Sequence, residues 1–291
     1  MFFRTDLALE IKEKKSEELQ GVKCETSEIK DVSVTKIKIL TKGASKILEK
    51  PVGEYITIQV RDFSDNKKET EFLSSIVSKY IKKFIPNEGL ILVVGLGNLN
   101  ITPDSLGPKA CETILATRHI RSEFSKVGID ILRSVAVISP GVLGQTGIEV
   151  LDIIKSLVKE IKPEAVVLID ALASKDASRL AKTIQISNTG ISPGSGVSNS
   201  RPSINKKSIG IDVVSIGIPM VIDATTIAAD ILGLETEDEL KSLKEKVSLK
   251  ESSLMVTPRD IDVLVDRSAK LLGMSVNLAL QGNFDFEDFP S

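Results

Sequence analysis

The chain has 291 residues, of which 42% are hydrophobic, so it is long enough to bury a full globular core. Its formal net charge of −2 argues against direct binding to nucleic acid, and no apolar run reaches the roughly 20 residues that cross a bilayer. Only Cys24 and Cys111 occur and the N-terminus lacks a signal-peptide pattern, which together predict a cytoplasmic chain without a disulfide framework.

Strands and helices alternate in the first part of the chain. Alternating apolar residues predict strands over residues 34–40 and 55–60, and apolar residues at helical spacing predict a helix within 67–85. Residues 90–95, LILVVG, form a continuous apolar run that is typical of a strand covered on both faces. A helix is expected from Pro108, because proline suits the first helical position.

The same alternation continues to the end of the chain. Residues 129–137 read as a strand, and Thr146 and Glu149 have capping-box spacing ahead of a helix over 150–161. The remaining expected elements are strands over 165–170, 182–187 and 212–218, and helices over 223–233, 235–246 and 260–280, the last capped by Thr257 and Pro258. Strands alternating with helices predict one α/β domain, with a mostly parallel or mixed sheet sandwiched by helices.

A glycine-containing loop, GLGNLNITPDSLGP, follows the strand at 90–95. It resembles a dinucleotide loop, but Asn100 stands where that motif needs its third glycine. The loop instead presents Asn98, Asn100 and Asp104 at the carboxyl end of a strand, where ligands bind in α/β sheets. These three residues are therefore candidates for the site.

A second carboxylate, Asp170, follows the apolar run at 165–169. If the two strands are neighbours, Asp104 and Asp170 meet at one edge of the sheet. A close carboxylate pair shares a proton, so that one member can activate water while the other protonates a leaving amine. Each aspartate also has a structural interpretation, Asp104 as a turn residue and Asp170 as a cap or an ion-pair partner.

Two further loops are rich in glycine and end at the same predicted edge of the sheet. SPGVLGQTG contains Gly141 and Gln145, and the loop at 191–210 contains Gly194 and Gly196. Their backbone groups could hold an extended peptide by oxyanion contacts or strand-like pairing. Ordinary turns remain an equally good interpretation of their spacing.

Histidine is scarce, since His119 is the single one in the sequence. A serine triad, a Cys-His pair or a histidine-rich zinc site would each need it. It lies between Arg118 and Arg121 near the end of a predicted helix, where a basic residue is favoured by the helix dipole. The chemistry is therefore expected to depend on carboxylates, hydroxyls or lysines.

Seven motifs, in register along nearly the whole chain, together resemble the germination protease family of spore-forming Firmicutes. They are RTDLALE, VVGLGNLNITPDSLGP, SPGVLGQTG, LIDALAS, SPGSGVSNSR, IGIPMVIDATTI and MVTPRDID. The resemblance implies a fold similar to hydrogenase maturation peptidases and an endopeptidase that degrades small acid-soluble spore proteins in the forespore and spore core. The family's two essential aspartates lie in the motifs that here contain Asp104 and Asp170, which implies an atypical aspartic mechanism without a cofactor. No metal is expected, because His119 lies in none of these motifs.

The resemblance also implies a homotetrameric zymogen that removes its own N-terminal propeptide. The family cuts after an acidic residue and before a hydrophobic one that is often followed by alanine, and Asp6, Leu7 and Ala8 fit that order. Residues 1–6 are thus expected to be the propeptide and residues 7–291 a single peptidase domain. Thr5 or Asp6 could also cap a helix. A metal-dependent peptidase on the same fold and a non-catalytic α/β binding protein are the alternatives.

Overall fold

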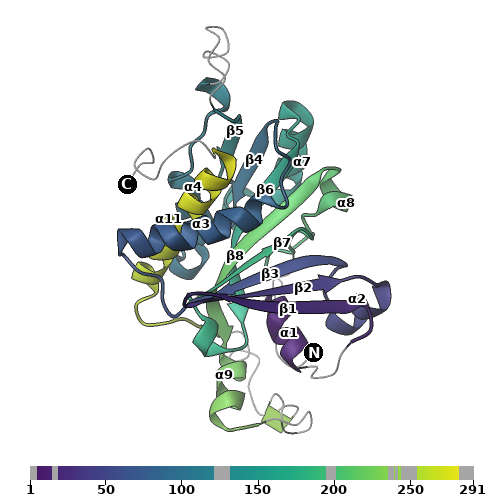
Figure 1. The fold of residues 1–291 in the computed structure, drawn as a ribbon, viewed down its shortest axis with the longest axis vertical. Coiled ribbons are helices and arrows are strands. Elements are labelled where there is room, and N and C mark those ends of the chain that lie inside the picture. The colour runs from purple at the N-terminus through teal and green to yellow at the C-terminus, as the bar shows by residue number, and fades with distance from the viewer. Residues whose placement is uncertain are drawn as a thin grey trace.

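The computed structural model describes residues 5–14, 19–120, 132–194, 201–234, 239, 242–243 and 254–281. Through this part of the chain runs one mixed β-sheet, with helices on both of its faces (Figure 1). Its path has the order β1-β2-β3-β7-β8-β6-β4-β5, and β9 pairs with β8 outside that path. The strands are β1 (Val22–Ile29), β2 (Val32–Ile39), β3 (Gly53–Gln59), β4 (Ile91–Gly95), β5 (Val135–Ile138), β6 (Ala165–Ser174), β7 (Thr183–Ser187), β8 (Asp212–Asp223) and β9 (Met255–Val256).

The sheet has a parallel part and an antiparallel part. The strands β8, β6, β4 and β5 are parallel neighbours, joined by the crossover helices that parallel pairing requires. From β7 to β1 every pairing is antiparallel. The expected α/β fold with a mixed sheet between helices is confirmed.

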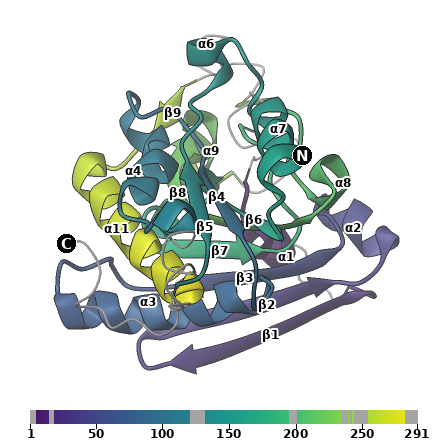
Figure 2. The same cartoon turned by 90° about the horizontal axis from the view of Figure 1, so that it is seen from above.

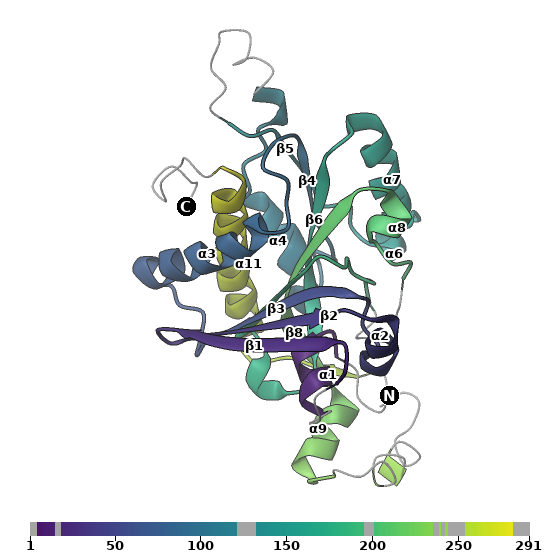
Figure 3. The same cartoon turned by 45° about the vertical axis from the view of Figure 1, so that its right-hand side comes forward.

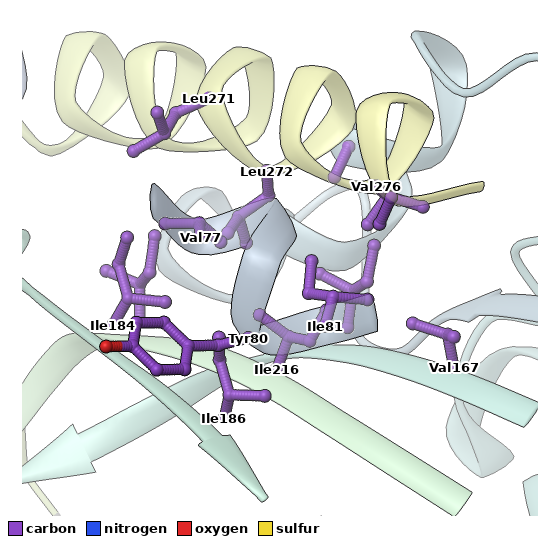
Figure 4. Close-up of a cluster of buried hydrophobic side chains, with 14 of the residues drawn as sticks. Val77, Tyr80, Ile81, Val167, Ile184, Ile186, Ile216, Leu271, Leu272 and Val276 are labelled. Atoms are coloured by element: carbon purple, nitrogen blue, oxygen red, sulfur yellow. The ribbon is translucent and has the colours of Figure 1, made fainter. Parts of the chain in front are cut away.

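One face of the sheet is covered by three helices, α3 (Lys67–Lys82), α4 (Leu106–Glu112) and α11 (Ile261–Leu280). Viewed from above, they lie on the opposite side of the sheet from α7 (Val150–Ile161) and α8 (Lys206–Ile209) (Figure 2). Side chains of α3 and α11 converge over the central strands, where Val77 and Leu272 meet above Ile216 (Figure 4). All three are fully buried, so this layer forms the main core.

Two smaller clusters cover the other face. The helices α7 and α8 pack on alternate residues of β4 and β6, including Leu92 and Leu168. The helices α1 (Ala8–Lys14) and α2 (Lys42–Leu48) pack on Ile37 of β2 and Tyr55 of β3 (Figure 3). A helix begins at Ala8, directly after Asp6 and Leu7, as one interpretation of RTDLALE expects. The expected caps are wrong, because Thr5 Oγ1 accepts from the Leu7 amide ahead of the helix and Asp6 Oδ2 accepts from the Ala173 amide.

The pattern-based prediction misses several elements, among them β1 and α2. Six of the eight residues of β1 are exposed, so its sequence shows no apolar face for periodicity to detect. Its pairing with β2 fixes it instead. The short α2 is capped by the Thr41 side chain, which accepts a hydrogen bond from the Ala44 amide.

Several expected helix starts differ from those in the structure. The helix expected from Pro108 begins at Leu106. The capping box is wrong, because Thr146 Oγ1 accepts from the Ile148 amide and α7 begins after Glu149 without a side-chain cap. The last helix begins at Ile261, so Thr257 and Pro258 lie before it rather than capping it.

Two expected elements fall partly on residues outside the description. Of the strand expected over 129–137, residues 135–137 belong to β5, residues 132–134 are not strand and residues 129–131 lie outside the described residues. Most of the helix expected over 235–246 also lies outside them, whereas the helix expected over 223–233 is α9 (Ala224–Ile231). No helix in the described part of the chain is long and apolar enough to cross a membrane.

Gly107 sets how closely α4 approaches the sheet. A Cβ at this position would lie 2.3 Å from the Leu96 carbonyl oxygen and 2.5 Å from that of Ile169. We predict that Gly107→Ala lowers the free energy of unfolding by about 1–3 kcal/mol, because backbone atoms must move apart. Urea unfolding measures this loss. Gly144→Ala is the control, since no atom lies within 4 Å of a Cβ there, and an equal loss in both variants would contradict the packing argument.

Candidate active site

Asp170 lies within β6 rather than at its end, which corrects the sequence-based prediction. The neighbouring β4 ends at Gly95, opposite Ile169, whereas β6 continues to Ser174 along β8. The apolar run stops at Asp170, but pairing with β8 extends the strand. Asp170 is therefore the first residue of β6 beyond the end of β4, and it is 6% exposed.

Asp104 reaches the same edge from the loop after β4. It ends a short 3-10 helix, η1 (Thr102–Asp104), and its Oδ2 accepts a hydrogen bond of 2.8 Å from the Asn98 amide. Gly97 permits this turn, because its φ is +117° and a Cβ there would lie 2.0 Å from the Asp104 carbonyl oxygen. The parallel pairing of β4 with β6 thus brings the two aspartates together, as expected.

A cavity of about 460 Å³ opens at this edge of the sheet. Asp104 and Asp170 both line it, and Asp6 lines it with them. The two expected glycine loops form part of its wall through Gly141 and Gly194. This volume is in the range of cavities that bind small molecules or a few residues of a peptide.

Burial favours the protonated form of both aspartates, and neighbouring negative charge adds to this effect at Asp170. Burial raises the pKa of Asp170 well above its usual range, and the nearby charges of Asp104 and Asp6 raise it further. Burial also raises the pKa of Asp104, although the hydrogen bond from the Asn98 amide acts in the opposite direction. Asp170 is thus the member better suited to hold a proton.

The other expected residues differ in their relation to the cavity. Asn98 lines it. Its Oδ1 accepts a hydrogen bond of 2.6 Å from Gln145 Nε2, and this contact stabilises the loop that carries Asp104. Asn100 is exposed and does not line the cavity, because the turn directs its backbone amide to Asn98 Oδ1. Gly196 lies outside the described residues.

The N-terminal segment pairs with residues 170–174 of β6, which extend beyond the end of β4 and form an overhang. The Asp6 amide donates to the Ala173 carbonyl oxygen at 2.9 Å, and the Ala173 amide donates to Asp6 Oδ2 at 2.9 Å. Ile169 turns its carbonyl toward the loop after β4, where Leu96 donates to it. The backbone groups of every second residue of a strand point to the same side, so those of Ala173 point the same way as the Ile169 carbonyl. Asp6, which pairs with Ala173, therefore occupies the position that a continuation of β4 would fill.

Two side chains hold the carbonyl oxygen of the Asp6–Leu7 peptide bond. Lys50 Nζ donates to it at 2.9 Å and Gln185 Nε2 at 2.8 Å. Gln185 Oε1 accepts from the Ala8 amide at 2.7 Å. Burial lowers the pKa of Lys50 from its usual value, against the opposing influence of Asp6, Glu10 and Glu49.

Glu10 anchors the segment on the other side of this bond. Its carboxylate is fully buried and accepts from Thr5 Oγ1, from Ser174 Oγ at 2.6 Å and from the Lys175 amide at 3.0 Å. It also pairs with Arg179 at 3.6 Å. Leu7 is fully buried as well, so the chain is fixed on both sides of the Asp6–Leu7 bond.

Neither the sequence pattern nor the resemblance assigns Lys50, Gln185 or Glu10 to this site. The one available signal is the polar Gln185 inside the apolar strand sequence TIQIS. Lys50 lies among other charged residues and shows no pattern.

A metal centre was the main alternative for the chemistry. Among the described residues, no group of three or more His, Cys, Asp or Glu side chains is placed to hold a metal ion. His119 is exposed and does not line the cavity. The two aspartates alone are an incomplete ligand set for a divalent ion of the zinc type.

Comparison with known proteins gives one consistent family. The sequence profile described as germination protease matches residues 4–234. A germination protease of Clostridium perfringens strain SM101 is 41% identical over 98% of this chain and 97% of its own length. That of Clostridium tetani is 38% identical over 100% of this chain and 99% of its own, and that of Geobacillus sp. WCH70 is 34% identical over 97% and 94%.

A solved structure, that of the NiFe hydrogenase maturation protease HycI from Thermococcus kodakarensis KOD1, is also similar. Its sequence is 16% identical, the TM-score is 0.39, and the overlap covers 69% of this chain and 99% of that one.

The buried carboxyl group of Asp170 gives the stability of the chain a testable dependence on pH. Its pKa is raised on folding, so between the unfolded value of about 3.9 and the folded value the folded state binds the extra proton. We therefore predict that the free energy of unfolding of wild type falls, relative to that of Asp170→Asn, by about 1.4 kcal/mol per pH unit in this window. Urea unfolding of both proteins from pH 4 to pH 7 measures the difference. A wild type that gains relative stability with rising pH would contradict it.

Proposed function

The chain belongs to the germination protease family and is an endopeptidase, and we propose that its substrates are small acid-soluble spore proteins, degraded in the spore core at germination. We further propose that it is made as a zymogen, expected to be a homotetramer, that cuts its own Asp6–Leu7 bond. The observation that carries the proposal is the position of Asp6, which lines the same cavity as Asp104 and Asp170.

In the proposed mechanism the two aspartates divide acid and base work. Asp104, which is less buried than Asp170 and accepts a hydrogen bond from an amide, acts as the base that takes a proton from water. The water oxygen attacks the carbonyl carbon of Asp6. Asp170, with its raised pKa, gives its proton to the Leu7 nitrogen as the C–N bond breaks. The products are a carboxylate on Asp6 and a free amine on Leu7.

Substrate peptides are proposed to bind as an added strand along the overhang of β6. The backbone groups of Ala171 and Ala173 point to the side where β4 has ended, and Asp6 already pairs with Ala173 there. The Ala173 amide donates to the Asp6 carboxylate, which supports a preference for an acidic residue before the cut. Leu7 is fully buried, which supports a hydrophobic residue after it.

The same contacts give a physical account of latency. While Asp6 pairs with Ala173 of β6, it occupies the edge on which a substrate would pair. After the proposed cut, the helix α1 stays anchored by its core contacts and by Glu10, and Leu7 before it is buried, whereas residues 1–6 can leave. Asp6 is thus sufficient to cover the edge at Ala173.

We predict that Asp104→Asn and Asp170→Asn each lower cleavage of a purified acid-soluble spore protein by about 10²–10⁴-fold, because each removes a proton-transfer group. Gel analysis of timed digests measures the rate. The matched control is Asp152→Asn, an exposed residue of α7, which should cleave at the wild-type rate.

Two results would exclude this mechanism. Wild-type rates in both aspartate variants would favour a binding protein contaminated by another protease. Loss of wild-type activity after exhaustive chelation, restored by a divalent ion, would favour the metal-dependent peptidase.

We predict that self-cleavage has a rate constant independent of protein concentration, because Asp6 lines the cavity of the aspartates in its own chain and Leu7 is buried. Intact-mass measurements over a tenfold dilution series, at several pH values, follow the loss of the first six residues. A rate constant that falls in proportion to dilution would show cutting between separate molecules and would contradict this geometry.

A further inference from the structure

We propose that Lys50 and Gln185 form the carbonyl-binding half of the active site, opposite the aspartate pair. This inference rests on the proposed function, because it takes the Asp6–Leu7 bond as the bond that is cut. Lys50 and Gln185 are then catalytic residues in the strict sense that they contact the reacting carbonyl group.

The geometry of the Asp6 carbonyl oxygen carries the proposal. It accepts two side-chain hydrogen bonds, of 2.9 Å from Lys50 Nζ and 2.8 Å from Gln185 Nε2. The donors come from distant parts of the chain, Lys50 from the loop after α2 and Gln185 from β7. They also line a second cavity, of about 390 Å³, and Asp6 lines this cavity as well as the one that holds the aspartates. The scissile residue therefore lies where the two cavities meet.

Each donor is held in a donating orientation. The Ala8 amide donates to Gln185 Oε1 at 2.7 Å, so the amide nitrogen of Gln185 must point to the Asp6 carbonyl oxygen. Lys50 is surrounded by the carboxylates of Asp6, Glu10 and Glu49, and Tyr55 of β3 lines the same cavity. These carboxylates favour its charged form against the effect of burial.

Hydrolysis of the Asp6–Leu7 bond requires hydrogen-bond donors at the carbonyl oxygen, which Lys50 and Gln185 would supply. When water attacks the Asp6 carbonyl carbon, the carbonyl oxygen gains negative charge. An ionised carboxylate can only accept hydrogen bonds, so in that state Asp104 cannot stabilise this oxygen. A lysine cation and an amide N–H that already contact it would do so without reorganisation. The positive charge near the Asp6 side chain would also favour an acidic residue at this position.

Self-cleavage of the full-length chain tests the proposal. Lys50→Met should lower the first-order rate constant of self-cleavage by about 10²–10³-fold, the loss that follows removal of one such donor. Lys50→Arg should recover most of the rate, because it restores a charged donor. Gln185→Met should lower the rate in the same direction. Lys46→Met, on the exposed side of α2, is the matched control and should cut as wild type does.

Two further measurements separate a catalytic role from a structural one. Circular dichroism and thermal melting show whether each variant is folded, and Gln185→Met replaces Lys50→Met in the comparison if the latter is not. The pH profile gives an independent signature: self-cleavage of wild type should fall in alkaline buffer as Lys50 loses its proton, and Lys50→Arg should extend activity to higher pH. If Lys50 had only a structural role, Lys50→Arg would not shift the alkaline side of the pH profile.

The failure of this inference differs from the failure of the proposed function. If wild type cuts at Asp6–Leu7, and the folded Lys50→Met or Gln185→Met chain cuts equally fast, the carbonyl-binding role is wrong and the aspartate mechanism stands. If wild type never cuts this bond, or Asp170→Asn cuts it at the wild-type rate, the proposed function fails and this inference fails with it.

Discussion

The strand β6 continues to Ser174 while its neighbour β4 ends opposite Ile169, and the rest of the site depends on this overhang. It leaves one side of β6 without a strand partner and places Asp170 at the point where that open edge begins. Pairing with β8 on the other side keeps the overhang extended. The loop after β4 must turn back at this point, and its turn at Gly97 brings Asp104 next to Asp170.

An open strand edge inside a protein needs a partner for its backbone groups. In the intact chain Asp6 supplies one by pairing with Ala173. The same residue lines the cavity that holds the aspartates, and its carbonyl oxygen accepts hydrogen bonds from Lys50 and Gln185. On the proposed mechanism, folding, latency and self-cleavage are consequences of one arrangement, in which Asp6 lines both the cavity of the aspartates and that of Lys50 and Gln185.

Much of this could be predicted from sequence, because apolar runs reveal buried strands. The runs before Asp104 and Asp170 place both residues at the carboxyl edge of a parallel sheet. The continuation of β6 past Asp170 could not be predicted, since it depends on pairing with β8 rather than on local pattern. The exposed strand β1 has no apolar period to detect. Lys50 reaches the site only through tertiary packing, and the sequence around it shows no pattern that would predict this.

Hydrogen exchange of the overhang, compared before and after removal of residues 1–6, tests the central claim most directly. The claim is that Asp6 occupies the open edge of β6 where a substrate strand would pair. Peptides covering residues 170–176 should exchange slowly in the intact chain and markedly faster after the cut, because the Ala173 amide loses its partner. Equal exchange in the two states would contradict the claim and would place the N-terminal segment elsewhere in solution.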